Sequence, residues 1–419
     1  MDRDFSLVEA LKGIKSLKKG KSSALDAISN DILHCASETG AITVLQGVFN
    51  NLIKFRVFPR QWATGIIVPL HKGGEIEDPN NYRGITLNSC ISKFFTLLLN
   101  NRLSKWCEDN NIIKYNQIGF RKGFRTSDHI FTLKTIIDEA FMKKQKIYVC
   151  FIDFKKAYDS VWRNGLFYKL IKNGLSKKFV NFIRNMYKEL QLCVSLQNGL
   201  SLPFKSMVGL KQGCNLSPLL FNMFVNDIPS IVNNSNCDPP VLGSLPVSSL
   251  LYADDLILIS KSKEGLQNAI DELDNFSKDW FIEINQMKTK CMVFSKGKSV
   301  QISNFTIGDK SLSFCNDYCY LGVMFSKSGS FKLASSALTD KATNAMFALI
   351  KNLYKHRSVD CVIMLDLFDK MISPIALYGV EVWGLNFLPA NKGNKDLFDK
   401  IHLAKHLTEN IHYRFLKML

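Results

Sequence analysis

Hydrophobic and polar residues follow two different periods along this chain, and together they predict a mixture of helices and strands. From Asn88 onward, apolar residues recur at helical spacing as far as Trp106, and either Asn88 or Ser89 could cap the start of that helix. Before it, two apolar runs flank a charged, glycine-rich loop between Lys72 and Arg83. This arrangement predicts two strands joined by a loop.

The middle of the chain contains shorter apolar runs that are typical of buried strands. Residues 148–154 (YVCFIDF) form one such run, and a helix is expected after the capping residues Asp159 and Ser160. Ser217 is expected to be the N-cap of another helix, with Pro218 at its first position. We therefore expect strands and helices to alternate here.

The composition changes twice toward the end of the chain. Residues 237–246 (CDPPVLGSLP) have the composition of a loop. From about Phe331 onward the apolar spacing is mostly helical. The pattern thus predicts mixed α/β structure up to about residue 330 and mostly helix after it.

The most informative stretch is SSLLYADDLILIS, residues 248–260, in which Asp254 and Asp255 stand between two apolar runs. The runs predict two buried strands joined by a tight turn, so the aspartates would lie at the tip of a hairpin. An ordinary acidic turn would use the same residue type. Buried strands on both sides argue against that reading. Adjacent carboxylates also repel each other, so a positive charge is expected beside them, and a divalent cation is the strongest candidate.

A third aspartate has a similar setting. Asp153 stands at the end of the apolar run 148–154, far from Asp254 in the chain, so only the fold could bring the two together. Three carboxylates at neighbouring strand ends would form an all-oxygen site, which suits Mg²⁺. A pair of such ions can support phosphoryl transfer.

Charge and composition narrow the classes of partner. The chain has 419 residues with 54 Lys and Arg against 37 Asp and Glu, a net charge of +17. Such an excess in a folded chain indicates an acidic polymer, most often nucleic acid, although a solvated basic surface is the alternative. With 46% hydrophobic and 22% charged residues, we expect a globular protein of two or three subdomains.

Cysteines and apolar runs bear on the compartment. Eleven scattered cysteines indicate a reducing compartment, and Cys315 and Cys319 are expected to be buried thiols. The N-terminus has no apolar core of signal-peptide length, and no apolar run reaches the roughly 18 residues of a membrane span. We expect an intracellular protein without membrane contact. His402 and His406 are expected to be surface residues and not metal ligands.

Motifs across nearly the whole chain resemble those of reverse transcriptases from non-LTR (LINE-type) retrotransposons. FIDFKKAYDSV and YADD carry the resemblance most clearly. The other matching blocks follow in family order at residues 19–33, 58–103, 116–130, 209–228, 280–294, 320–325 and 374–384. The resemblance implies an α+β right-hand polymerase, with an antiparallel palm sheet backed by helices. Its domains would be an N-terminal extension and fingers at 1–147, a palm at 148–330, and a helical thumb with a truncated post-thumb segment at 331–419.

The implied activity is that of an RNA-directed DNA polymerase, a nucleotidyltransferase that adds dNTPs to a DNA primer on an RNA template. By this resemblance, Asp153, Asp254 and Asp255 ligate two Mg²⁺ ions, for which Mn²⁺ could substitute. Lys288 would protonate the leaving pyrophosphate, although the nearby Lys290 could fill the same role.

The resemblance also assigns contacts with the incoming nucleotide. Lys72 and Arg83 would hold the triphosphate, Lys as a point charge and Arg through its planar fork. Tyr158 would be a steric gate against the 2′-hydroxyl, or else a core tyrosine at a strand–helix junction. Gln212 would hydrogen-bond the nucleotide, or else belong to a plain turn. Asp159 is expected to be a helix cap and not a metal ligand.

Contacts with nucleic acid are implied at two further places. The template backbone would lie against Arg121, Lys122, Arg125 and Thr126. The primer backbone would be held by the turn Tyr320, Leu321 and Gly322, which could also be a simple hairpin.

Other readings share these motifs. The chain resembles a fragment that lacks the endonuclease domain, and a truncated or inactive relic that only binds RNA is the alternative function. An RNA-directed RNA polymerase shares the palm and the paired aspartates, but Tyr158 argues against it. A group II intron-type enzyme also shares the palm, but residues 374–384 favour the LINE type. We expect a ribonucleoprotein in the nucleus or cytoplasm, and the sequence predicts no oligomeric state.

Overall fold

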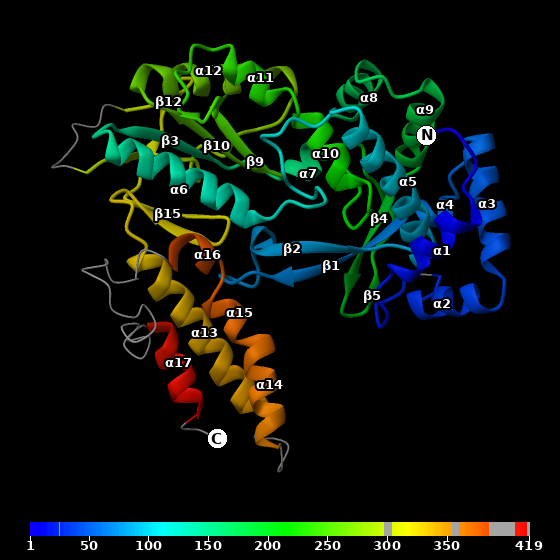
Figure 1. Cartoon of the computed structure of the whole chain (residues 1–419). Helices are drawn as coiled ribbons and strands as arrows, with labels where there is room; N and C mark the ends of the chain where they lie inside the picture. The colour runs from blue at the N-terminus through cyan, green and yellow to red at the C-terminus, as the bar shows by residue number, and fades with distance from the viewer. Residues whose placement is uncertain (25, 297–303, 354–359, 385–406, 417–419) are drawn as a thin grey trace. The chain divides into compact units, whose positions relative to one another are not determined.

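The computed structural model describes residues 1–24, 26–296, 304–353, 360–384 and 407–416. Its helices and strands confirm the expected α+β class (Figure 1). The chain divides into two compact units. Unit 1 comprises 1–122, 153–231 and 273–285, and unit 2 comprises 123–152, 232–272 and 286–419. The boundaries of these two units differ from those predicted for the fingers, palm and thumb, and that three-part division stays a prediction.

Unit 1 combines helices with one five-stranded sheet. Its helices are α1 (Leu7–Lys15), α2 (Asn30–Glu38), α3 (Ile42–Phe55), α4 (Arg60–Ala63), α5 (Cys90–Asp109), α7 (Ala157–Ser160), α8 (Arg163–Lys172), α9 (Lys177–Lys188) and α10 (Ser217–Val225), with the 3₁₀ turn η1 (Pro79–Asn81). Its strands are β1 (Thr64–His71), β2 (Tyr82–Leu87), β4 (Gln191–Leu196), β5 (Gly199–Leu200) and β6 (Phe204–Lys205). The sheet order is β2-β1-β4-β5, and β6 also pairs with β4. The predicted strands around the charged loop are β1 and β2, which pair antiparallel.

Unit 2 contains a second five-stranded sheet, in the order β14-β11-β3-β10-β9. Its strands are β3 (Ile147–Ile152), β9 (Ser249–Tyr252), β10 (Asp255–Ser260), β11 (Lys290–Phe294) and β14 (Ser313–Phe314). Short hairpins are formed by β7 (Val241–Leu242) with β8 (Leu245–Pro246), β12 (Thr306–Ile307) with β13 (Lys310–Ser311), and β15 (Asp317–Tyr320) with β16 (Val323–Ser326). The main sheet is antiparallel as predicted, except that β11 and β14 pair parallel over two residues.

Helices of unit 2 cover this sheet and form the C-terminal region. They are α6 (Thr126–Met142), α13 (Lys332–Leu353), α14 (Cys361–Met371), α15 (Ser373–Ala376), α16 (Val380–Trp383) and α17 (Leu407–Leu416). Two further helices, α11 (Ile228–Asn233) and α12 (Lys263–Asp279), contribute residues to both units. The described residues after Phe331 are mostly helical, which confirms that expectation. His402 and His406 lie outside the described residues.

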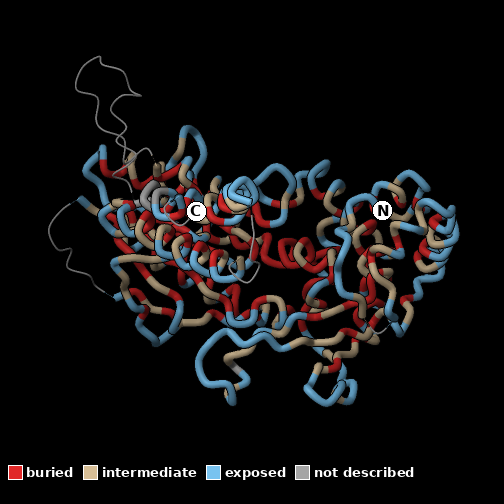
Figure 2. Tube along the Cα trace, turned by 90° about the horizontal axis from the view of Figure 1, so that it is seen from below, coloured by how far each residue is buried: buried red, intermediate tan, exposed pale blue. Residues whose placement is uncertain are grey.

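The core of unit 2 explains why its strands are apolar. Val149 and Phe151 of β3 lie in one buried cluster with Leu133 and Ile137 of α6 and with Phe325 of β16. Figure 1 shows α6 lying along the sheet. In the trace coloured by burial, buried stretches alternate with exposed connecting loops (Figure 2). The apolar run at 148–154 therefore contains most of β3, a central strand that α6 covers on one face.

Several local expectations are tested by the structure. Ser89 caps α5 as expected, with its hydroxyl accepting from the Ser92 N–H at 3.2 Å. Ser217 is not the N-cap of α10, because that position belongs to Leu216 and the Ser217 hydroxyl donates to the Lys211 carbonyl at 2.6 Å. The loop predicted at 237–246 contains the short hairpin β7–β8.

All eleven cysteines are free thiols. The expectation that Cys315 and Cys319 are buried is wrong, because Cys315 is half-buried and Cys319, on β15, is exposed. Within the described residues, none of the helices combines the length and the apolar character needed to cross a bilayer.

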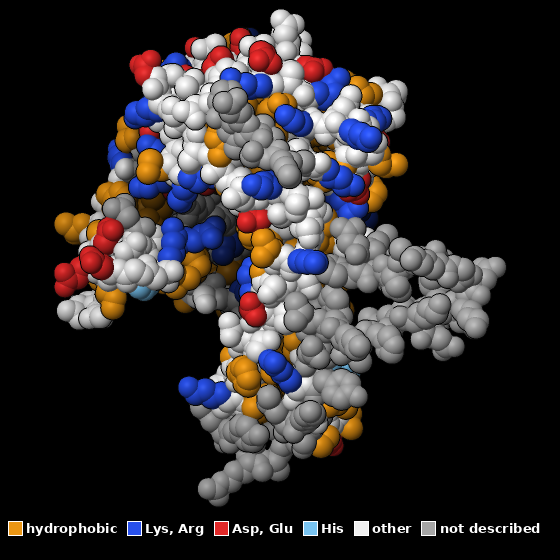
Figure 3. Space-filling view, turned by 90° about the vertical axis from the view of Figure 1, so that its left-hand side faces the viewer, with side chains coloured by type: hydrophobic (Ala, Val, Ile, Leu, Met, Phe, Trp, Pro, Cys, Tyr) orange, Lys and Arg blue, Asp and Glu red, His pale blue; other side chains and the backbone are white. Residues whose placement is uncertain are grey.

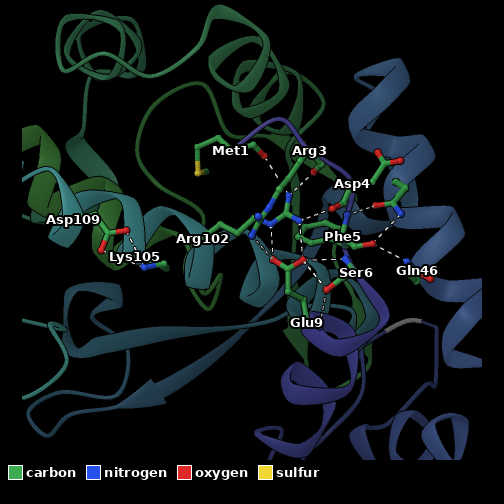
Figure 4. Close-up of polar contacts among 11 residues, drawn as sticks. Met1, Arg3, Asp4, Phe5, Ser6, Glu9, Gln46, Arg102, Lys105 and Asp109 are labelled. Atoms are coloured by element: carbon green, nitrogen blue, oxygen red, sulfur yellow. Dashed lines mark hydrogen bonds and ion pairs between the residues drawn. The ribbon is translucent and has the colours of Figure 1, made fainter.

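The N-terminal segment of unit 1 is anchored by a buried arginine of α5 (Figure 4). The Arg102 guanidinium donates to both carboxylate oxygens of Glu9, at 2.8 and 2.9 Å. It also donates to the carbonyls of Met1, Arg3 and Asp4, at 3.3, 2.5 and 2.8 Å. The hydrogen bonds from Arg102 hold the pKa of Glu9 down at about 2. One side chain therefore ties the first turn of α1 and the chain before it to α5.

Replacing Glu9 with glutamine is expected to lower the free energy of unfolding at pH 7 by about 1–3 kcal/mol, because it removes charge-assisted hydrogen bonds from a buried guanidinium. The pKa of Glu9 is lower in the folded chain than its usual 4.5. Its contribution is therefore complete above pH 4.5 and is lost as the pH falls through about 2.

Urea titrations of the wild type and of Glu9→Gln at pH 7 and at about pH 3 measure this effect. The difference between the two proteins should shrink at the lower pH. The exposed loop residue Glu77 provides the matched control, and Glu77→Gln is expected to change stability by less than about 0.5 kcal/mol. A difference that is the same at both pH values would contradict the role of the Glu9 charge.

Candidate active site

In the sheet of unit 2, the residue before Asp153 and the residue after Asp255 are partners on neighbouring strands. In the antiparallel pair of β3 and β10, Ile152 is the partner of Leu256. Asp153 directly follows Ile152 along the chain, and Asp255 directly precedes Leu256. The chain therefore leaves β3 toward Asp153 at the end of the sheet where β10 begins. The sequence predicted this neighbourhood, but the register comes from the fold.

The paired aspartates lie on a tight hairpin, as predicted. Tyr252 pairs with Asp255, so only Ala253 and Asp254 form the turn between β9 and β10. Ala253 has a φ of 58°, in the left-handed region that two-residue hairpin turns require. Asp254 and Asp255 are exposed, and Asp153 is half-buried. The strands bury their apolar residues and present the carboxylates at the tip.

The donor chemistry of this strand end fits a hard divalent cation. Carboxylate oxygens are the ligands that Mg²⁺ takes from proteins, usually one or two of them together with water and substrate phosphate. In the described part of the chain, no group of three or more His, Cys, Asp or Glu side chains is arranged to hold a metal. The assignment of Asp153, Asp254 and Asp255 as metal ligands therefore stays a prediction.

Tyr320 lies close to the aspartate hairpin and is buried. Its side chain is 3% exposed, and Phe151 of β3 lies 6.0 Å from it between ring centroids. Burial and, second, the negative charge of Asp255 raise the pKa of Tyr320 well above its usual value. A buried phenol cannot reach a primer strand, so a primer contact at this turn would have to come from Leu321 and Gly322.

Tyr158 is held in place by packing and by its own backbone. Its ring stacks on Phe221 of α10, with centroids 4.6 Å apart and planes 24° apart. The Tyr158 carbonyl accepts the Leu210 N–H at 2.7 Å. The next residue, Asp159, accepts a hydrogen bond from the Gln212 side chain at 2.7 Å. Two residues that the sequence assigns to nucleotide contacts, Tyr158 and Gln212, thus belong to one connected cluster.

The expectation that Asp159 caps a helix is wrong. It lies inside the one-turn helix α7, whose N-cap is Lys156, and α8 begins later, after Trp162. Its carboxylate is used in a tertiary contact with Gln212 instead. A capping prediction rests on local spacing alone, and a partner 53 residues away has no local signature.

Arg163 is a residue of this cluster that the sequence did not single out. Its guanidinium donates to the carbonyls of Ser206, Gly209 and Val208 at 2.6, 2.8 and 2.9 Å. These bonds fix the segment that leads to Gln212. Arg163 is the first residue of α8, where the helix dipole disfavours a cation. A cation at the start of an expected helix could have indicated that Arg163 has a tertiary role.

Gly209 allows this segment to approach α7 closely. Its φ is +81°, and a Cβ atom there would lie 2.4 Å from the Asp159 carbonyl oxygen. Its N–H donates to the Val161 carbonyl at 3.0 Å. Any larger residue would push Gln212 away from Asp159.

A cavity of about 400 Å³ within unit 1 borders this segment. Its polar lining includes Thr86, Asp159, Lys205, Lys211 and Gln212. Lys211 is 3% exposed and donates to the Trp62 carbonyl, and burial lowers its pKa to about 8. A cavity of this volume can hold a small ligand. Gln212 lines the cavity, so its side chain borders a space that is present before any ligand binds.

Lys72 and Arg83 lie on one face of the β1–β2 hairpin. Leu70 pairs with Arg83, and the Lys72 N–H donates to the Asn81 carbonyl at 2.7 Å. Paired residues and residues two apart share a face of a ribbon, so the two cations are diagonal neighbours. Both are exposed. The structure brings these residues together, and their binding of a triphosphate stays a prediction.

The two lysines considered for proton donation differ in their surroundings. Lys290 lies on β11, and its ammonium donates to the Ser313 hydroxyl at 2.6 Å. Lys288 precedes β11 and is exposed, whereas Lys290 is half-buried. The greater exposure of Lys288 favours it for the predicted role.

The residues predicted to contact the template also differ. Arg121 forms a two-pronged ion pair with Glu108, at 2.7 and 2.8 Å, and its side chain is 11% exposed. Its guanidinium is therefore already paired within unit 1, and a contact between Arg121 and the template stays a prediction. Lys122 and Arg125 are exposed. Thr126 begins α6, and its hydroxyl is hydrogen-bonded to Tyr378 at 2.7 Å.

The family model of the reverse transcriptases (RNA-dependent DNA polymerases) matches residues 70–325, more than half of the chain. The chain belongs to the reverse transcriptase family. The matched region begins just before Lys72 and ends within β16. Family membership confirms the resemblance on which the residue roles were assigned.

Curated relatives come from mobile elements. The chain is 29% identical over 387 residues to the probable RNA-directed DNA polymerase from transposon BS of Drosophila melanogaster, covering 90% of this chain and 42% of that protein. It is 28% identical to the corresponding protein of transposon X-element from the same species, covering 91% and 42%. The mobile element jockey polymerase of Drosophila funebris is 24% identical, covering 91% and 41%. This reverse transcriptase chain spans about two fifths of the length of these relatives.

A solved structure of apo telomerase from Candida tropicalis also resembles the chain. It has 14% sequence identity and a TM-score of 0.47, and the match covers 85% of this chain and 62% of that one.

Proposed function

We propose that this chain is an RNA-directed DNA polymerase that adds dNTPs to the 3′-hydroxyl of a DNA primer paired with an RNA template. The observation that carries the proposal is the register of β3 against β10, which leads Asp153 and the Asp254–Asp255 hairpin to one end of a buried sheet. Membership of the reverse transcriptase family supports the same reaction.

The carboxylates of Asp153, Asp254 and Asp255 would hold two Mg²⁺ ions, or Mn²⁺ in their place. When bound, such ions lower the pKa of the primer hydroxyl and neutralise charge on the triphosphate. Asp254 is exposed at the tip of a hairpin whose strands are buried, so it can meet a ligand without loss of core packing. Lys288 would donate a proton to the leaving pyrophosphate.

The side chains that recognise the nucleotide would come from the cluster around Tyr158 and from the β1–β2 hairpin. Lys72 and Arg83 are exposed cations on one face, which suits triphosphate oxygens. Tyr158 is pinned by its stack on Phe221, as a steric gate must be. Gln212 is oriented by Asp159.

The net charge of +17 supports a nucleic-acid partner. Lys and Arg side chains are spread over the face drawn in Figure 3. Lys122 and Arg125 are exposed and would contact the template backbone, and the Leu321–Gly322 turn would contact the primer. The chain would act inside the cell as part of a ribonucleoprotein. Its domains would have the fingers, palm and thumb arrangement of a right-hand polymerase.

Primer extension by the purified chain tests the proposal. A DNA primer annealed to an RNA template is incubated with Mg²⁺ and either dNTPs or NTPs in separate reactions. We expect extension with dNTPs and little with NTPs. Extension with NTPs alone would instead establish an RNA-directed RNA polymerase. A folded protein that binds RNA tightly in a salt-sensitive way but extends no primer would be an RNA-binding relic.

A further inference from the structure

The stretch PIALYGVEVWG, residues 374–384, matches the family beyond the predicted thumb helices but has no role in the proposed reaction. In unit 2 it forms the end of α15, a turn at Tyr378–Gly379, and α16. Tyr378 is the residue of this stretch that reaches toward the segments predicted to contact nucleic acid.

The Tyr378 hydroxyl connects two of those segments. It donates to the Leu321 carbonyl at 3.1 Å, and it lies 2.7 Å from the Thr126 hydroxyl oxygen. A carbonyl can only accept, and a phenol has one proton to give. The Thr126 hydroxyl must therefore donate to Tyr378. The phenol oxygen thus links the first residue of α6 to the turn between β15 and β16.

The Tyr378 ring packs against the same turn. Gly322 has a φ of +88°, and a Cβ atom there would lie 2.9 Å from the Tyr378 Cε1 atom. Leu321 also has a positive φ, of 45°. Only a residue without a side chain fits at position 322 both for its backbone angle and for the space left by the ring.

Tyr378 is itself held from behind. The Trp383 indole N–H donates to the Tyr378 carbonyl at 2.9 Å. Trp383 is 1% exposed and belongs to the same buried cluster as Tyr320 and Val323, which flank the turn. Gly379, with a φ of 68°, lets the chain reverse between the two aromatic residues. The tyrosine, glycine and tryptophan of the stretch thus form one brace.

We propose that Tyr378 is a positioning residue that holds the Leu321–Gly322 turn and the start of α6 in one arrangement for a primer–template duplex. The inference rests on the proposed polymerase function. A fixed bridge between the two segments would reduce the ordering needed when the duplex binds. Loss of the bridge should therefore weaken duplex binding and leave nucleotide binding unchanged.

The variant Tyr378→Phe removes only the hydroxyl and tests this role in steady-state extension by the full chain. We expect the KM for primer–template to rise about 3- to 10-fold, the value of one neutral hydrogen bond or two weak ones, while the KM for dNTP changes less than about twofold. Thr126→Val should give a similar rise. The double variant should be no worse than Tyr378→Phe, because that change already removes both hydrogen bonds of the phenol.

Tyr168→Phe is the matched control. Tyr168 is 57% exposed on α8, and its hydroxyl has no hydrogen-bond partner among the described residues, so primer–template KM should not change. An active Tyr378→Phe enzyme with wild-type primer–template KM, or additive effects in the double variant, would overturn the inference.

A wild-type chain that extends no primer would count against the proposed function but still leaves the brace testable. In that case primer–template affinity is measured by fluorescence anisotropy, and amide hydrogen exchange is measured over residues 320–323. Tyr378→Phe should weaken affinity about 3- to 10-fold and speed exchange in this turn. The inference is wrong if Tyr378→Phe binds primer–template with the wild-type affinity. It is also wrong if the amides of residues 320–323 exchange at the wild-type rate in this variant.

Discussion

Replacing Asp254 with asparagine is expected to abolish nucleotide addition, with kcat at least about 10³-fold below the wild type. The substitution keeps the shape of the side chain but removes the negative charge that a divalent cation needs. Asp254 is exposed in the two-residue turn between β9 and β10, so its loss should not affect the core. Single-turnover primer extension with an RNA template measures the effect.

The control for this prediction is Asp309→Asn. Asp309 is also an exposed turn residue of unit 2, between β12 and β13, and its substitution should leave extension unchanged. RNA binding and the unfolding transition of Asp254→Asn should match those of the wild type. Activity within about tenfold of the wild type would show that the hairpin does not hold the catalytic ions. Asp153→Asn should be equally inactive, and Asp255→Asn should lose less.

Replacing Tyr158 with valine is expected to raise the use of ribonucleotides relative to deoxyribonucleotides by about 10²-fold, the usual size of discrimination over one hydroxyl group. The aromatic ring is fixed by its stack on Phe221 and by the hydrogen bond from Leu210 to its carbonyl. A ring that cannot move aside can exclude a 2′-hydroxyl, and a valine leaves that space open. The measurement is kcat/KM for GTP and for dGTP on the same primer–template.

Tyr168→Val is the matched control, because Tyr168 is an exposed tyrosine of the same unit and should not affect sugar selection. The expected outcome for Tyr158→Val is a gain in GTP use with a modest loss in dGTP use. Unchanged discrimination in a folded and active variant would make Tyr158 a core residue of the strand–helix junction and move the gate elsewhere.

Features that depend on neighbouring residues were predictable from the sequence. The Asp254–Asp255 hairpin follows from two apolar runs and a short turn, and Tyr252 indeed pairs with Asp255. Ser89 caps α5 because a cap bonds a backbone N–H three residues away. The two strands around the charged loop follow from the same kind of local pattern, and their register then places Lys72 and Arg83 on one face.

Features that depend on distant partners were not predictable. Asp159 has the residue type of a helix cap, but the Gln212 side chain takes its carboxylate. Arg121 has the residue type of a phosphate ligand, but Glu108 takes its guanidinium. Tyr320 lies in a motif expected to contact primer, but its ring is buried in the core of unit 2. In each case the residue type indicated what the side chain could bind. The sequence did not show which neighbours the side chain contacts in the folded chain.

By itself, the sequence determined the periods of the strands and helices, the two acidic motifs and the family, because side-chain alternation, turns and motifs are properties of contiguous residues. The tertiary structure alone decided that β3 lies beside β10, that Arg163 holds the segment leading to Gln212, and that Tyr378 bridges α6 and the Leu321–Gly322 turn. These contacts join residues that are tens to hundreds of positions apart. Their geometry depends on how the sheets and helices pack together, and a hydrogen bond between distant residues leaves no local pattern in the chain.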